Sequence, residues 1–75
     1  MSDVTTFTFR VSGMHCGSCG MLIDERVEEL PGVRRSQTSV RAGRTVVDVD
    51  RADADPEVLA AAITAAGYPA RLEAP

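Results

Sequence analysis

The apolar residues of this 75-residue chain change their spacing several times, and each change predicts a new element of secondary structure. Residues 6–11 alternate between polar and apolar, which predicts a half-buried strand that begins near Val4. From about Ser18 to Leu30 the apolar residues recur at the spacing of one helix face, and Pro31 and Gly32 end that helix. The residues expected on the buried faces are Phe7, Phe9, Val11, Cys19, Leu22, Ile23, Val27 and Leu30.

Two strand-like segments follow, at about 33–40 and 45–50. The short loop between them has Gly43 at its third position, which suits a hairpin turn that needs one residue at positive φ. Val47 and Val49 are expected to face inward. The first of the two segments is weaker, because Ser36 and Thr38 occupy inward positions. It is therefore expected to be either an edge strand or a loosely packed one.

A second helix is marked by its ends. Asp55 is a favourable N-cap, and Pro56 suits the first helical position. Gly67 is the expected residue just beyond the helix, and residues 68–72 leave room for a last strand. The inward stripe expected on this helix consists of Leu59, Ala62, Ile63 and Ala66.

The predicted order is therefore β-α-β-β-α-β. In one short chain this order indicates the ferredoxin-like α+β sandwich, with a four-stranded antiparallel sheet and both helices on one of its faces. We expect a single domain over residues 1–75 with a core of about 4–73, since the chain is too short for a second domain.

Chemistry is concentrated in one loop, Met14-His15-Cys16-Gly17-Ser18-Cys19, which holds both cysteines of the chain and its one histidine. The positive end of a helix favours thiolate, and two converging thiolates suit a soft ion of low coordination number. Cu(I) fits best, because sulfur ligands select it and two can satisfy it. Zn(II) or Cd(II) would need further ligands, from His15, an acid, water or a second protein.

A dithiol redox centre is the main alternative for this motif. Thioredoxin- and glutaredoxin-like proteins also place a Cys-x-x-Cys pair at the start of a helix. In those proteins the helix leads to a parallel strand, whereas here a hairpin pattern follows it. The proline and aromatic residues expected in or beside such a pair are also missing. These differences favour metal binding.

The segment from Gly13 to Cys19, the helix end Leu30-Pro31-Gly32-Val33 and the segment 66–70 together resemble the heavy-metal-associated domain family. The likeness extends from about residue 7 to 72, and the chain is similar to small bacterial copper chaperones and to the amino-terminal domains of copper-transporting P-type ATPases. It implies that Cys16 and Cys19 bind Cu(I) and pass it to a similar domain by ligand exchange, without enzymatic activity. His15 departs from the small residue common in relatives, which bears on metal preference.

Four other residues have more than one interpretation each. Met14 is either a thioether ligand or, as we favour, an apolar plug that packs on the core below the loop. His15 is a third ligand, a charge that stabilises thiolate, or a solvated imidazole. Tyr68 either steadies the thiolates through its hydroxyl or covers the edge of the core. Met21 is expected to flank a docking surface rather than to bind metal.

Composition excludes several partners. The net charge is −3 and the pI about 4.9, so there is no basic excess for nucleic acid or anionic lipid. No apolar run approaches the roughly 20 residues that cross a bilayer, and the first residues lack the features of a secretory signal. We therefore expect a cytoplasmic protein. The acids expected on the solvated side of the first helix, where they would steer a basic partner, are Asp24, Glu25, Glu28 and Glu29.

Three functions remain open at this point. The favoured one is a Cu(I) metallochaperone that supplies a copper-transporting P-type ATPase or a similar acceptor, with a copper-bridged homodimer as a further possibility. The second is a domain of the same fold that binds Hg(II), Zn(II) or Cd(II), or one excised from an ATPase. The third is a dithiol oxidoreductase.

Overall fold

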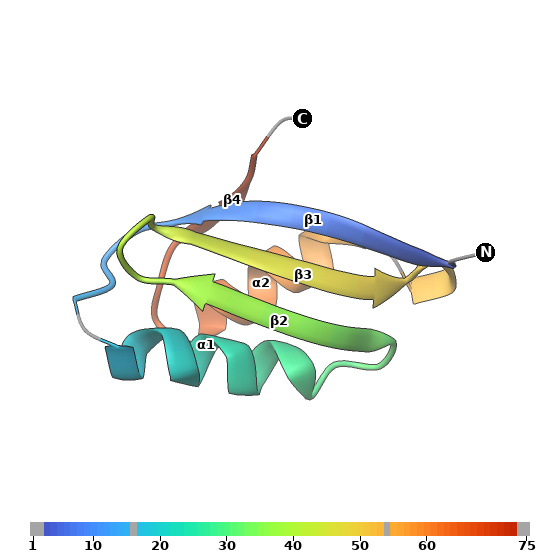
Figure 1. Cartoon of the computed structure of the whole chain (residues 1–75), viewed down its shortest axis with the longest axis horizontal. Coiled ribbons are helices and arrows are strands. Elements are labelled where there is room, and N and C mark those ends of the chain that lie inside the picture. Colours follow the sequence, from blue (N-terminus) through green and yellow to red (C-terminus); the bar gives the residue numbers. More distant parts are fainter. Residues whose placement is uncertain (1–2, 16, 54, 74–75) are drawn as a thin grey trace.

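The computed structural model describes residues 3–15, 17–53 and 55–73, and its elements follow the predicted order (Figure 1). A short 3-10 turn, η1, lies between the third strand and the second helix and was not predicted. The elements are β1 (Val4–Val11), α1 (Gly17–Glu28), β2 (Val33–Ser39), β3 (Arg44–Asp50), η1 (Arg51–Asp53), α2 (Pro56–Ala65) and β4 (Ala70–Leu72).

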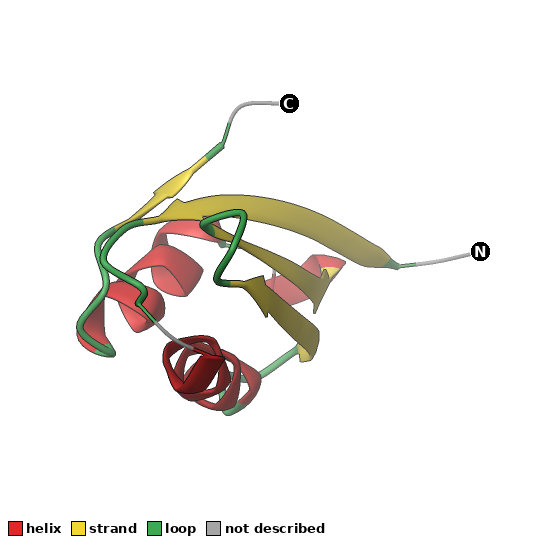
Figure 2. Ribbon diagram, turned by 60° about the vertical axis from the view of Figure 1, so that its left-hand side comes forward, coloured by secondary structure: helices red, strands yellow, loops and turns green. Residues whose placement is uncertain are grey.

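The four strands form one antiparallel sheet in the order β2-β3-β1-β4. β1 is central, with Phe7 opposite Val47 on one side and Phe9 opposite Leu72 on the other. Both helices lie against the same face of the sheet (Figures 1 and 2). The predicted ferredoxin-like α+β fold is confirmed, and so is the prediction of β2 as an edge strand.

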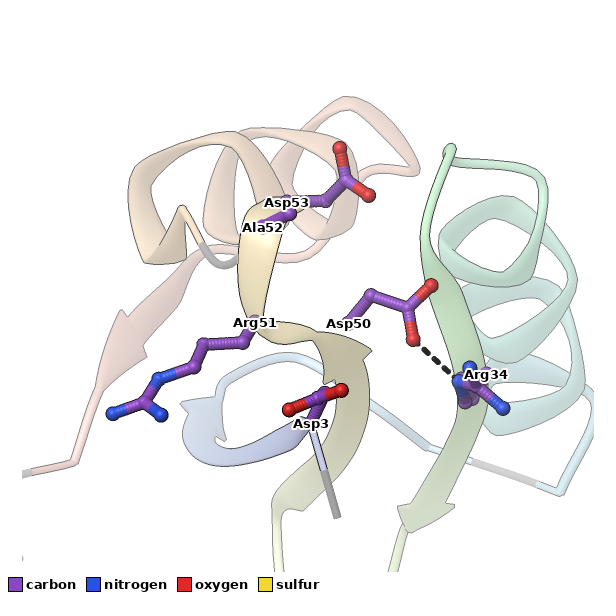
Figure 3. Close-up of a pocket in the computed structure, with 6 residues that line it drawn as sticks. All are labelled: Asp3, Arg34, Asp50, Arg51, Ala52 and Asp53. Atoms are coloured by element: carbon purple, nitrogen blue, oxygen red, sulfur yellow. Dashed lines mark hydrogen bonds and ion pairs between the residues drawn. The ribbon is translucent and has the colours of Figure 1, made fainter. Parts of the chain in front are cut away.

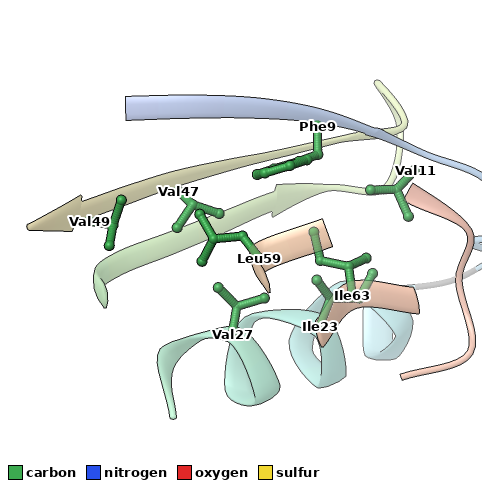
Figure 4. Packing of buried hydrophobic residues seen from close by; sticks show 8 residues of the cluster. All are labelled: Phe9, Val11, Ile23, Val27, Val47, Val49, Leu59 and Ile63. Carbon is green, nitrogen blue, oxygen red and sulfur yellow. The ribbon is translucent and has the colours of Figure 1, made fainter. Parts of the chain in front are cut away.

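The core lies between that face and the two helices (Figure 4). Alternate residues of β1 and β3 point down toward the helices, as the period of two predicted. Each helix contributes residues one turn apart, which meet the strands from below. The buried hydrophobic residues are Phe9, Val11, Ile23, Val27, Val47, Val49, Leu59 and Ile63, all of them expected inward from the sequence.

The turns have the predicted chemistry. Gly43 has φ +67° and Gly67 has φ +106°, a region that side chains with a Cβ rarely adopt. The Asp55 carboxylate accepts a hydrogen bond from the Glu57 amide at 3.1 Å, which makes Asp55 the N-cap of α2. These residues fix where the hairpin turns and where α2 begins and ends.

Two boundaries differ from the predicted ones by two residues, and the others agree to within one. α1 ends at Glu28 rather than Leu30, because the chain tightens there and the Leu30 amide donates to the carbonyl of Val27, 3.0 Å away. β4 begins at Ala70 rather than Tyr68. Pro69 just before it has no N–H to donate to a ladder, and the Pro69 carbonyl accepts instead from the Ser12 amide at 3.0 Å.

The prediction that Asp24 lies on the solvated face of α1 is wrong. This side chain is half-buried and points to β2, where its carboxylate accepts hydrogen bonds from Ser36 and Thr38. The exposed Glu28 also reaches the strand and accepts from the Ser36 amide. A 3.6-residue period places both acids beside the apolar stripe rather than opposite it. Glu25 and Glu29 are exposed as expected.

None of the helices in the described part of the chain is long and apolar enough to cross a bilayer.

The core can be tested on α2, where one apolar residue is buried and another is not. Ile63 is fully buried, so Ile63→Ala should lower the free energy of unfolding by about 2–5 kcal/mol through lost burial and a cavity. Val58 is 50% exposed, and Val58→Ala should change it by less than about 1 kcal/mol. Urea unfolding followed by circular dichroism measures both. Equal losses would contradict the assignment of the buried face.

Candidate metal centre

The loop between β1 and α1 is fixed at its base from two sides. The Val11 amide donates to the carbonyl of Gly43 at 2.8 Å, which ties the end of β1 to the β2–β3 hairpin. The Ser12 amide donates to the carbonyl of Pro69 at 3.0 Å, which ties the loop to the segment before β4. The loop therefore leaves the sheet between these two turns. Sequence reasoning missed both anchors, since the bonded groups are backbone atoms.

Cys19 lies in the first turn of α1 and is half-buried. The first backbone N–H groups of a helix have no partner within it, and they favour negative charge nearby. This is the setting that the sequence predicted for a thiolate. Cys16 lies outside the described residues, so its pairing with Cys19 stays a prediction.

Met14 and Tyr68 lie against the core, which is one of the positions that the sequence predicted for each of them. Met14 is half-buried and packs against the core, as expected of an apolar plug. Tyr68 also packs against the core, and its Cδ1 is 3.9 Å from the position that a Cβ on Gly13 would take. Tyr68 is therefore beside the loop as well as at the edge of the core. His15 is exposed.

Within residues 3–15, 17–53 and 55–73, no three side chains of His, Cys, Asp or Glu are grouped as a metal site would require. Met21, two residues after Cys19 on α1, is 72% exposed. A large apolar side chain in that position fits the predicted flank of a docking surface.

Charged side chains are arranged in a way that the sequence did not reveal. Arg10 on β1 lies opposite Arg44 of β3 and opposite Arg71 of β4, so three exposed arginines form a row across the sheet. Arg44 pairs with Glu73, with 3.2 Å from Nε to Oε2. This row could be recognised only from the strand register, because the register places residues that are far apart in the sequence side by side.

A hollow of about 540 Å³, whose lining residues are drawn in Figure 3, lies beside η1, at the end of the sheet opposite to the β1–α1 loop (Figure 1). Its charged residues alternate in sign, and Arg34 forms an ion pair with Asp50 across it. The hydrogen bond that Arg34 donates to Asp50 within this pair raises the pKa of the Arg34 guanidinium above its ordinary value. Among the described residues, neither Cys19 nor His15 lines the hollow. The lining residues are Asp3, Arg34, Asp50, Arg51, Ala52 and Asp53.

With the fold and loop described, comparison with known proteins decides the family. The profile of the heavy-metal-associated domain matches residues 8–69, which include the whole loop and both helices. The chain belongs to this family. Its fold, its element order and the resemblance of its loop are thereby confirmed, and it is a heavy-metal-binding domain.

Individual relatives differ in the metal that their names give. The chain is 35% identical over 72 residues to a copper-exporting P-type ATPase of Mycobacterium tuberculosis, which covers 95% of this chain and 9% of the ATPase. It is 32% identical over 65 residues to a mercuric reductase of Shigella flexneri, with 87% of this chain and 11% of the reductase covered. The chain thus spans only a small part of these relatives.

A third relative is of similar size. The copper chaperone CopZ of Enterococcus hirae is 31% identical over 64 residues, which cover 85% of this chain and 93% of the chaperone. Among solved structures, a putative copper-ion-binding protein of Bacillus anthracis superposes with a TM-score of 0.85 at 28% identity, covering 95% of this chain and all of that one (100%). Small proteins of this family thus exist beside the domains of larger ones.

Met14 gives a test of the loop's support. Met14→Ala should lower the free energy of unfolding by about 1–3 kcal/mol, because Met14 is only half-buried, and should also weaken metal retention. The number of sulfur ligands, measured by X-ray absorption on the Cu(I)-loaded protein, should stay the same. Met21→Ala is the control, with little expected change in either quantity because Met21 is exposed. Loss of one sulfur neighbour in Met14→Ala would instead make Met14 a ligand.

Proposed function

We propose that this domain carries Cu(I) on the thiolates of Cys16 and Cys19 and passes it to a domain of similar ligand set. The observation that supports this most is the place of Cys19. It lies in the first turn of α1, half-buried, and it ends the Cys-x-x-Cys motif of a heavy-metal-associated domain. Copper is cargo in this function and is not needed to complete the core, which already joins the sheet to both helices.

The choice of Cu(I) rests on ligand chemistry. Thiolates select soft ions, and Cu(I) is stable with two of them. Two relatives whose names include copper, the Mycobacterium tuberculosis ATPase and the Enterococcus hirae chaperone, match nearly the same part of the chain. The second of these relatives is named as a copper chaperone, which is the role proposed here.

Transfer follows from an open coordination position. A thiolate of the partner enters beside the two cysteines and gives a three-sulfur intermediate, from which one original thiolate then leaves. Cys19 is held by the first turn of α1, so we expect Cys16 to be the first ligand exchanged. Metal–sulfur bonds alone form and break, so the function requires no enzymatic activity.

The partner that suits this chemistry is the metal-binding domain of a copper-transporting P-type ATPase, or another acceptor with two thiolates. Exposed Met21, two residues after Cys19 on α1, would then flank the contact with the partner. A second copy of the chain offers the same ligands, which allows a copper-bridged homodimer. We place the protein in the cytoplasm, where its thiols stay reduced.

Hg(II) is the second candidate cargo. It is a soft ion that two thiolates also satisfy, and the mercuric reductase of Shigella flexneri matches 87% of this chain. Zn(II) or Cd(II) would need more ligands, and the exposed His15 is free to turn toward either ion. A domain that belongs to a larger transporter or reductase would present the same loop.

Titration with Cu(I) against a chromophoric Cu(I) chelator tests the proposal. The parent protein should compete for one Cu(I) per chain, whereas Cys16→Ser and Cys19→Ser should each lose at least about 100-fold in affinity, since a hydroxyl does not replace a thiolate for this ion. Ala61→Ser, which adds a hydroxyl at an exposed site of α2, is the matched control and should bind like the parent. A parent that cannot compete would refute the proposal.

The identity of the cargo needs a separate measurement. Zn(II) in tenfold excess should leave the Cu(I) stoichiometry unchanged, because two thiolates satisfy Cu(I) but not Zn(II). Displacement of Cu(I) by equimolar Hg(II), but not by Zn(II), would favour the mercury alternative. Inductively coupled plasma mass spectrometry of the desalted protein gives the bound metal directly.

A further inference from the structure

α1 is fastened to the edge strand β2 by a polar clasp, which we define as Asp24 and Glu28 on the helix together with Ser36 and Thr38 on the strand. The Asp24 carboxylate accepts from the hydroxyls of Ser36 and Thr38, each at 2.7 Å, and from the Thr38 amide at 3.2 Å. Glu28 accepts from the Ser36 amide at 3.1 Å. The clasp thus joins two turns of the helix to alternate residues of the strand.

The clasp lies on the face of β2 that packs against the helices, and in antiparallel sheets such a face usually carries apolar side chains. Ser36 is 5% exposed and Thr38 is half-buried, and both face the helix layer. Thr38 also reaches Thr45 of β3, which is fully buried, with 2.8 Å between the hydroxyl oxygens. Buried polar groups of this kind are costly unless every one finds a partner. The arrangement is therefore specific, because the carboxylate and the hydroxyls must keep their geometry.

The clasp also occupies the outer edge of β2. Residues 36 and 38 are two apart, so their amides point to the same side of the strand. Both amides donate to carboxylates of α1 and are withdrawn from pairing with another strand. The hydrogen bonds from hydroxyls and amides of β2 together fix the position of α1 along the strand as well as its distance from the sheet.

Gly20 shows how close the helix comes. It is buried one turn before Asp24, and a Cβ built on it would lie 3.2 Å from Val40 and 3.3 Å from Thr38. Gly20, Asp24 and Glu28 therefore form one stripe against β2. Cys19 directly precedes Gly20, so the turn that carries the thiolate is the one pressed to the strand.

We propose that Asp24 is a positioning residue for Cys19: through Ser36 and Thr38 it holds the first turns of α1 on β2 and so keeps the metal-binding thiolate in place. The inference rests on the proposed metal-binding function. A ligand that is already ordered loses less freedom on binding, whereas a fraying turn must be ordered by the metal. Asp24 acts at a distance and does not touch the metal.

The test compares Asp24→Ala with Glu25→Ala, which removes the same charge from the next residue, an exposed one. Cu(I) affinity is measured by chelator competition at fixed pH, under conditions where circular dichroism shows each variant fully folded. A purely structural residue would not change affinity there, because apparent affinity depends on stability only through the folded fraction. We expect Asp24→Ala to bind Cu(I) about tenfold more weakly than the parent, and Glu25→Ala to bind within about twofold of it.

Thr38→Val approaches the clasp from the strand and preserves the shape of the side chain, so it decides the matter if Asp24→Ala does not fold. It should weaken Cu(I) binding by about threefold, since the Ser36 hydroxyl and the backbone amide of residue 38 still donate to Asp24. Amide hydrogen exchange gives a readout without metal. Exchange of the amides of residues 21–23, which donate to the carbonyls of the first turn of α1, should quicken in Asp24→Ala, and by more than exchange in β1 or β3, as expected of local rather than global loosening.

The outcomes separate the two claims. A parent that binds no Cu(I) overturns both the proposed function and this inference. A parent that binds, with folded Asp24→Ala and Thr38→Val variants that bind as tightly, overturns the inference alone. Weaker binding in Glu25→Ala equal to that in Asp24→Ala would also overturn it, because the effect would then come from charge and not from position.

Discussion

The pairing of β1 with strands on both sides is the constraint on which the site depends. β1 lies between β3 and β4, and its end at Val11 decides where the loop leaves the sheet. Backbone hydrogen bonds from Val11 to Gly43 and from Ser12 to Pro69 hold the start of the loop to the neighbouring turns. Met14 then packs on the core, and α1 begins at Gly17. The described start of the loop, from Ser12 to Met14, is thereby held against the sheet and the core, which suits a metal site whose ligands must converge.

The core explains how so short a chain supports such a loop. Phe9, Ile23 and Ile63 come from β1, α1 and α2 and are fully buried, so each layer of the sandwich is anchored to the others. A domain of this size buries a modest share of its surface, and loss of one such contact weighs heavily. The core joins all three elements through apolar side chains alone. Under the proposed carrier function, this allows the domain to release its cargo and stay folded.

Most of the fold could be predicted, because the periods of two and of about four residues report directly on which face is buried. The same periods correctly placed Val47 and Leu59 inward, and the chemistry of Asp55 and Gly67 placed the ends of α2. The two cysteines identified the loop from spacing alone. What could not be predicted depends on distant partners: the backbone anchors of the loop and the arginine row across three strands.

Asp24 shows most clearly why such features stay hidden in a sequence. An acid on a helix is usually solvated, and Ser36 and Thr38 suggested a weak strand. Each of these observations, taken alone, counts against a well-packed edge. Together they are complementary, since an acceptor on α1 meets donors on β2 at 2.7 Å. Apolar residues would have covered this edge without fixing the position of the helix along it, whereas directional hydrogen bonds cover the edge and also fix that position. The edge of the sheet farthest from β4 thereby becomes part of the support for Cys19.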